Sequence, residues 1–147
     1  MPIRILIADD NPQGVELLEA YLDELGAEIR TVGDGEATLK MVKEWKPDLL
    51  LLDIMMPRMS GFEVCKRLRA APETSNLAVM MITALDQAVD VDRAVEAGTD
   101  DFLTKPIDKT ELLLRVRALL QASKSEDELE RVLEYVDIVQ HGTVSVK

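Results

Sequence analysis

Residues 49–57 read Leu-Leu-Leu-Leu-Asp-Ile-Met-Met-Pro, an apolar run interrupted by one carboxylate. Successive leucines with no polar alternation are typical of a strand buried on both faces, as in the middle of a parallel sheet. Asp53 ends the leucine run, and Pro57 and Gly61 then break the chain before the next helical pattern. Because ligands of open α/β sheets bind outside the carboxyl ends of the strands, we expect Asp53 at a functional edge.

The segments on both sides of this run alternate between strand and helix patterns. Five short strand-like runs are each followed by a helical repeat, and they cover residues 3–8, 28–32, 49–53, 77–82 and 101–104. Asn11, Asp34 and Asp108 stand where helix N-caps are expected, with Pro12 at a first helical position. This pattern predicts an α/β fold, a doubly wound five-stranded parallel sheet with helices on both faces.

Composition and charge exclude several classes of protein. Of the 147 residues, 47% are hydrophobic and 31% are charged, which is typical of a globular chain. The formal net charge of −11 argues against direct contact with nucleic acid. We expect no membrane association, because no apolar run approaches the ~20 residues that span a bilayer. The absence of a signal peptide and the single cysteine, Cys65, lead us to expect a cytoplasmic protein.

Polar side chains end four of the five predicted strands. Asp9-Asp10, Asp53, Thr83 and Lys105 end the first, third, fourth and fifth strands, and parallel strands bring such ends to one rim. Carboxylates about 5 Å apart repel by about 3 kcal/mol per pair at an effective dielectric constant of about 20. Since one lysine cannot balance three carboxylates, Mg²⁺ is the expected counter-ion. Thr83 and Lys105 are the donors that a phosphoryl group on Asp53 would need.

These motifs resemble the receiver domains of two-component response regulators, and among them the chemotaxis receivers. The matching motifs are Asp9-Asp10, the run Leu-Leu-Asp53-Ile-Met-Met-Pro57-x-Met-Ser-Gly61-Phe-Glu, Thr83-Ala84 and Phe102-Leu-Thr-Lys105-Pro106. Together they cover about residues 3 to 120. The resemblance implies a flavodoxin-like strand order, 2-1-3-4-5.

The resemblance assigns a phosphoacceptor and a metal site. Asp53 is implied to accept the phosphoryl group. The implied Mg²⁺ ligands are Asp10 directly, Asp9 through water, Asp53, and the main-chain carbonyl of Met55. Catalysis in the family is mostly positioning and charge neutralisation. We therefore expect that the protein is not an enzyme acting on other substrates. It is expected to be a phosphoacceptor that catalyses its own phosphoryl transfer and slow dephosphorylation.

The resemblance also implies a switch and its partners. Thr83 and Lys105 would hold the phosphoryl oxygens, while Thr83 and Phe102 would move inward on phosphorylation. This movement would remodel the face formed by the fourth helix, the last strand and the fifth helix. The Lys105–Pro106 bond is implied to be cis. The expected partners are a histidine kinase or phosphotransfer protein as donor, and a downstream protein that reads the switched face.

The same residues also suggest alternative functions. A Mg²⁺-dependent phosphatase that works through an aspartyl-phosphate would need a further acid two residues after Asp53, where this chain has Met55. A flavodoxin-like cofactor binder would need a phosphate-cradling loop after the first strand, where Asp9-Asp10 would repel a phosphate. A third alternative is a receiver fragment of a larger regulator whose output domain is absent.

The predicted receiver domain covers residues 1–121, and residues 122–147 form a tail or linker. In the tail, Ser125 followed by Glu128 fits a helix-capping box. An apolar stripe follows at Leu129, Val132, Leu133 and Val136. The stripe predicts an amphipathic C-terminal helix that folds back on its own domain, forms a coiled-coil dimer seam or leads to another domain. We expect a homodimer whose stability depends on this tail.

Overall fold

The computed structural model describes residues 2–85, 87–123 and 139. The chain divides into two compact units, Met1–Pro106 and Ile107–Lys147. The first unit contains a five-stranded sheet. The strands are β1 (Arg4–Ala8), β2 (Glu28–Val32), β3 (Leu49–Asp53), β4 (Ala78–Thr83) and β5 (Asp101–Thr104).

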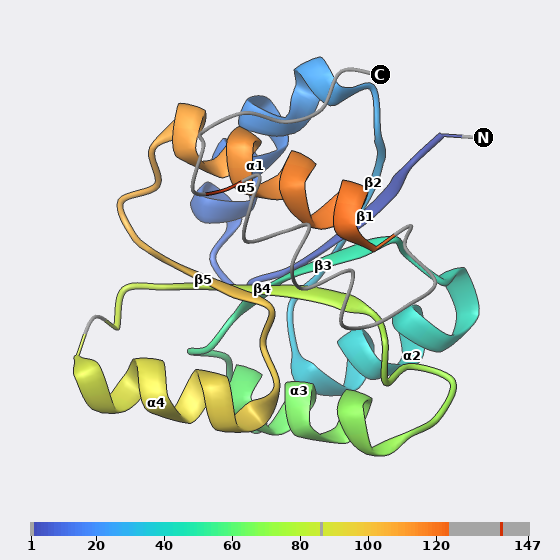
Figure 1. Ribbon diagram of the computed structural model, residues 1–147, viewed down its shortest axis with the longest axis vertical. Coiled ribbons are helices and arrows are strands. Elements are labelled where there is room, and N and C mark those ends of the chain that lie inside the picture. The colour runs from blue at the N-terminus through green and yellow to red at the C-terminus, as the bar shows by residue number, and fades with distance from the viewer. Residues whose placement is uncertain (1, 86, 124–138, 140–147) are drawn as a thin grey trace. The chain divides into compact units, whose positions relative to one another are not determined.

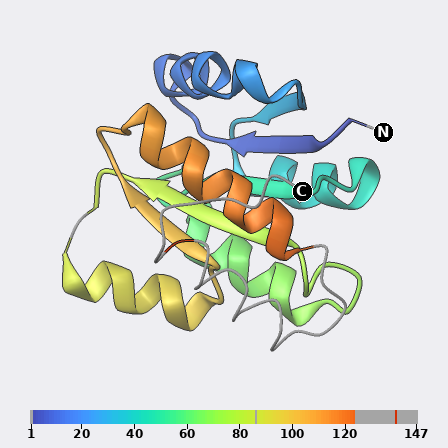
Figure 2. The ribbon, with the colours of Figure 1, turned by 45° about the horizontal axis from the view of Figure 1, so that its top comes forward.

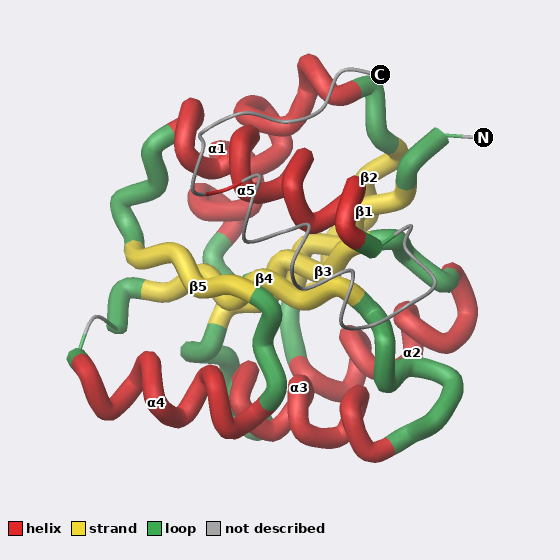
Figure 3. Tube along the Cα trace, viewed as in Figure 1, coloured by secondary structure: helices red, strands yellow, loops and turns green. Residues whose placement is uncertain are grey.

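The strand order is β2-β1-β3-β4-β5 (Figure 3), as predicted. Every neighbouring pair of strands is parallel, also as predicted. The leucine strand β3 lies in the middle, with Leu49 paired to Ile5 of β1 and to Ala78 of β4. Its four leucines are each at most 1% exposed. A continuous apolar run suits this position because both faces and both edges of the strand are covered.

Helices cover both faces of the sheet within the first unit. They are α1 (Pro12–Leu22), continued by the 3₁₀ turn η1 (Asp23–Leu25), α2 (Gly35–Trp45), α3 (Gly61–Ala70) and α4 (Ala88–Ala97). Figures 1 and 2 show α1 on one face and the other three helices on the opposite face. The side chains of Asn11 and Asp34 accept hydrogen bonds from the first turns of α1 and α2, so both predicted N-caps are confirmed.

The core of the first unit includes the inner side of α3. Phe62, Cys65 and Leu68 are at most 4% exposed and belong to one apolar cluster with residues of β1, β3 and β4. Burial raises the pKa of the Cys65 thiol to about 11. Cys65 is therefore a packing residue with little thiolate at neutral pH.

In the second unit, the structure describes α5 (Lys109–Ala122). Asp108 caps it by accepting the Glu111 N–H at 2.9 Å, as predicted. The predicted domain boundary after residue 121 stays a prediction, and the tail stripe from Leu129 to Val136 lies outside the described residues. Across residues 2–85 and 87–123, no helix combines the length and apolar character that a membrane crossing needs.

Candidate functional site

Three carboxylates meet at the carboxyl ends of β1 and β3. One oxygen each from Asp9, Asp10 and Asp53 lies within 4.8 Å of the other two. Asp9 and Asp53 are 5% and 7% exposed, whereas Asp10 is exposed to solvent. The site therefore combines two buried carboxylates with one that water can reach.

A single ammonium group contacts both buried carboxylates. The Lys105 Nζ lies 3.2 Å from Asp9 Oδ2 and 3.1 Å from Asp53 Oδ2. Lys105 follows β5, its own N–H donates to the Thr83 carbonyl at 2.7 Å, and the Lys105–Pro106 bond is cis, which confirms the predicted isomer. Burial alone would lower the pKa of Lys105, but hydrogen bonds and charges from Asp53 and Asp9 raise it above its ordinary value. The lysine is therefore charged at neutral pH.

Both oxygens of Asp53 have hydrogen-bond partners. The Met55 N–H donates to Oδ1 at 2.9 Å, and Lys105 donates to Oδ2 at 3.1 Å. Burial raises the pKa of the Asp53 carboxyl above its ordinary value of 3.8, and the charge of Asp9 adds to this. The two donors oppose the shift. Further positive charge near Asp53 would therefore stabilise the ionised form of its carboxyl group.

Two residues that support Asp9 were missed by the sequence analysis. The Asn11 N–H donates to Asp9 Oδ1 at 2.9 Å. A Cβ atom on Gly14 would lie 2.8 Å from Asp9 Oδ2, so a larger residue there would push the Asp9 carboxylate out of its present position. A glycine inside a helical pattern was the available signal, since it costs helix stability and needs a packing reason.

The predicted switch residues lie on the neighbouring strands β4 and β5. Thr83 is fully buried and follows Ile82, the register partner of Asp53. Its hydroxyl oxygen accepts the Leu85 N–H at 3.3 Å. Phe102 is half-buried and packs against the hydrophobic core of the first unit.

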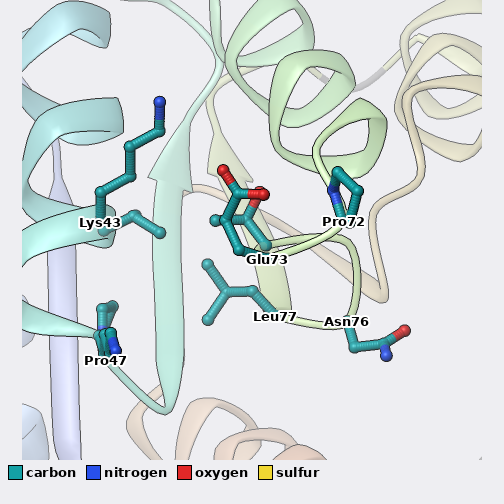
Figure 4. Close-up of a pocket in the computed structure, with 9 residues that line it drawn as sticks. Lys43, Pro47, Pro72, Glu73, Asn76 and Leu77 are labelled. Carbon is teal, nitrogen blue, oxygen red and sulfur yellow. The ribbon is translucent and has the colours of Figure 1, made fainter.

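A hollow lies near the amino ends of β3 and β4, at the edge of the sheet opposite to the carboxylates. Its volume is about 550 Å³, and Figure 4 shows Lys43 and Pro47 on one side and Pro72 and Asn76 on the other. None of the predicted site residues lines it. Size alone does not favour it as the functional site, because the charged groups that can do chemistry converge at the other edge.

The family comparison agrees with the geometry of the carboxylate edge. The family model for the response regulator receiver domain matches residues 5–117. The chain belongs to this family. The receiver is 45% identical over 131 residues to the response regulator PleD of Caulobacter vibrioides, covering 89% of this chain and 29% of PleD. It is 42% identical over 135 residues to the DNA-binding response regulator MtrA of Mycolicibacterium smegmatis, covering 92% of this chain and 57% of MtrA.

A solved receiver structure shows the same fold. The signal receiver domain of a signal transduction histidine kinase from Syntrophus aciditrophicus superposes with a TM-score of 0.78 at 34% sequence identity. The match covers 84% of this chain and 94% of that one. The receiver described here thus spans nearly all of an isolated receiver domain, but less than two thirds of either curated relative.

Proposed function

We propose that this receiver is a phosphorylation-activated switch in which Asp53 accepts a phosphoryl group from the phosphohistidine of a histidine kinase or a phosphotransfer protein. Response regulators receive their phosphoryl group from histidine kinases. The observation that carries the assignment to Asp53 is the Lys105 ammonium, which contacts the buried carboxylates of Asp9 and Asp53 at 3.2 and 3.1 Å.

The donor set fits Mg²⁺. Three carboxylates that offer oxygens within 4.8 Å of one another carry more negative charge than Lys105 can balance. Hard oxygen ligands with one solvent-exposed member suit a cation that keeps several of its waters. The carboxylates of Asp9, Asp10 and Asp53 and the carbonyl of Met55 would hold the ion, Asp9 through a water molecule. When bound, Mg²⁺ neutralises charge on the phosphoryl oxygens.

Phosphoryl transfer then needs little from the protein beyond positioning. A carboxylate oxygen of Asp53 forms a bond to phosphorus while the phosphorus–nitrogen bond of the donor breaks, and the nitrogen leaves with the electron pair and takes up a proton. The charged Lys105 stabilises negative charge on the phosphoryl oxygens throughout. The receiver in this proposal catalyses its own phosphorylation and slow dephosphorylation, with no other substrate.

Thr83 and Phe102 carry the signal away from Asp53. The hydrogen bond from the Leu85 N–H uses a lone pair of the Thr83 hydroxyl, so the hydroxyl hydrogen is available to a phosphoryl oxygen. An inward movement of Thr83 frees space that Phe102 fills from the neighbouring strand. Phe102 has no hydroxyl, so this switch acts by packing alone.

The output of the switch is a protein contact. The net charge of −11 disfavours contact between the receiver itself and nucleic acid, although the relative MtrA is a DNA-binding regulator. The receiver spans 57% of MtrA. In this proposal, a downstream protein or an output domain joined to the receiver reads the switch. We place this phosphotransfer in the cytoplasm, in keeping with one cysteine that is a buried free thiol.

The test is labelling by acetyl phosphate, followed by the mass of the intact protein. We expect the wild type to gain one phosphoryl group in Mg²⁺ and none in excess chelator. Asp53→Asn is expected to gain none, whereas Asp92→Asn, at an exposed position on α4, should behave as wild type. Equal labelling with and without the metal would refute the Mg²⁺ role, and labelling of Asp53→Asn would refute the acceptor.

A further inference from the structure

The loop between β3 and α3, residues 54–60, holds the donor that orients the phosphoacceptor. The N–H of Met55 in this loop donates to Asp53 Oδ1 at 2.9 Å. Two main-chain hydrogen bonds also hold the loop. Within it, the Met59 N–H donates to the Pro57 carbonyl at 2.7 Å, and at its end the Gly61 N–H of α3 donates to the Ile54 carbonyl at 2.9 Å. These two bonds connect Met59 to Pro57 and the start of α3 to Ile54, the residue before Met55.

A charged pair joins this loop to the turn before α2. The Arg58 Nη2 lies 3.2 Å from Asp34 Oδ2, while Asp34 Oδ1 accepts the Ala37 N–H at 2.8 Å. Asp34 is thus fixed by the first turn of α2. Arg58 holds a left-handed backbone with φ 68°, which is unfavourable for a residue with a side chain. Its side chain is 76% exposed, so the pair by itself contributes little to stability.

A close contact lies beside the charged pair. A Cβ atom on Gly35 would lie 2.8 Å from Met59 Cβ and 2.9 Å from Met59 Sδ. A hollow of about 200 Å³, lined by both loops, gives the end of the Met59 side chain room to move. The Met59 Cβ has no such freedom because it is bonded to the backbone. A larger residue at position 35 must therefore shift the backbone of the β3–α3 loop or of the first turn of α2.

We propose that Asp34, Gly35, Arg58 and Met59 form a loop brace, a positioning device that sets the Met55 amide and through it the Asp53 carboxylate. The inference rests on the proposed function, because Met55 also supplies the proposed carbonyl ligand of Mg²⁺. The brace residues touch neither the metal nor the phosphoryl group. They hold the β3–α3 loop in the position in which the Met55 N–H donates to Asp53 Oδ1.

Three variants test the brace. Gly35→Ala adds the Cβ atom that collides with Met59. Gly33→Ala, two residues away in the same turn, adds a Cβ atom with nothing within 4 Å and is the matched control. Asp34→Asn keeps a good N-cap but removes the charge that faces Arg58. Thermal unfolding checks that all three variants fold.

The first readout is the amide resonance of Met55 in metal-free protein, and the second is the Mg²⁺ dissociation constant. We expect Gly35→Ala to shift the Met55 resonance and to weaken Mg²⁺ binding about tenfold, as outer-sphere changes commonly do. Asp34→Asn should change both in the same direction by less, and Gly33→Ala should match the wild type.

An unmoved Met55 resonance and wild-type Mg²⁺ affinity in Gly35→Ala would overturn the brace. An equal change in Gly33→Ala would also overturn it, because the effect would then belong to the turn and not to the contact with Met59. Failure of the proposed function is visible separately, as a wild type that neither binds Mg²⁺ nor labels at Asp53. In that case the metal-free Met55 resonance still decides whether the contact positions the loop.

Discussion

Asp53 is a buried carboxylate whose charge is costly while no metal is bound. Burial raises its pKa above the ordinary value of 3.8, so the folded state binds a proton on Asp53 more tightly than the unfolded chain does. The stability linked to this group is complete below the ordinary pKa and is lost as the pH rises through the raised, folded-state pKa. At neutral pH the ionised Asp53 therefore destabilises the metal-free protein.

We predict that Asp53→Asn is more stable than the wild type at pH 7 in the absence of Mg²⁺, because asparagine has no charge to bury. The difference should shrink as the pH falls through the raised folded-state pKa of Asp53, because the wild-type carboxyl is then protonated too. Added Mg²⁺ should reverse the order, since a ligand at 100 times its dissociation constant stabilises the wild type by about 2.7 kcal/mol. Urea unfolding at several pH values measures this. The control Asp10→Asn replaces an exposed carboxylate and should gain less stability than Asp53→Asn. The prediction is contradicted if Asp53→Asn is less stable than the wild type at pH 7 without Mg²⁺.

Lys46, like Arg58, has a left-handed backbone conformation that is unfavourable for a residue with a side chain. It ends α2 in the left-handed conformation, with φ 55°, and its N–H donates to the Val42 carbonyl at 3.0 Å. Glycine adopts this conformation without the steric cost of a Cβ atom. We predict that Lys46→Gly stabilises the protein by about 0.5–1 kcal/mol.

The matched control for Lys46 lies one turn earlier. Lys43 is inside α2, so Lys43→Gly should lose about 1 kcal/mol of helix stability. Trp45, the single tryptophan, is 5% exposed and its fluorescence reports unfolding in both variants. Destabilisation by Lys46→Gly would show that the lysine side chain contributes more than the backbone cost removes.

Among the elements, α3, α4 and the sheet are joined through one arginine. Arg69 of α3 donates to the carbonyls of Gly98 at 2.8 Å, Ser75 at 3.0 Å and Leu77 at 2.6 Å. It also pairs with Asp100 at 2.9 Å, and the two side chains are 20% and 30% exposed. One guanidinium thus satisfies the end of α4 and the chain before β4.

We predict that Arg69→Met destabilises the protein by about 3 kcal/mol, because it leaves a partly buried carboxylate and several carbonyls without this donor. Arg67→Met is the control on the same helix. Arg67 pairs with Glu63 at 3.1 Å, but both side chains are about half exposed, so its loss should cost less than about 0.5 kcal/mol. Equal effects in urea unfolding would show that the Arg69 contacts are dispensable.

The elements themselves follow closely from the sequence, because their signals are local. The apolar run of β3 and the caps Asn11, Asp34 and Asp108 depend on neighbouring residues, and the structure bears them out. The Arg69 contacts join residues up to 31 positions apart, so no local sequence pattern predicts them. The Met59–Gly35 contact is of the same long-range kind.

The candidate site follows from topology and charge. Parallel strands bring Asp9, Asp53 and Lys105 to one edge, and their convergence is visible once the strand order is known. The supports of that site, Asn11 and Gly14, depend on how closely α1 approaches Asp9. That distance is a packing result that spacing along the chain does not contain. The hollow beside Lys43 cannot be predicted from the sequence either, because its lining comes from the end of α2 with the residues after it and from the separate loop before β4.

For the whole molecule, self-association has to overcome a large negative charge. Two copies that each carry −11 repel, although salt at 0.15 M screens such repulsion beyond about 8 Å. Exposed ion pairs add only about 0–1 kcal/mol each, so they cannot carry a dimer alone. Apolar area must supply the rest, and the stripe Leu129, Val132, Leu133 and Val136 offers it in the sequence.

We therefore predict that the 147-residue chain forms a dimer whose stability depends on the residues after Gln121. Sedimentation of this chain beside a chain ending at Gln121 measures the effect, and only the longer chain should dimerise at micromolar concentration. Raising the salt concentration should strengthen the dimer, because screening removes the repulsion while apolar contacts remain. Leu133→Ser in the longer chain should weaken it without shortening the chain. Identical monomer profiles for both lengths would rule out the tail as the dimer element.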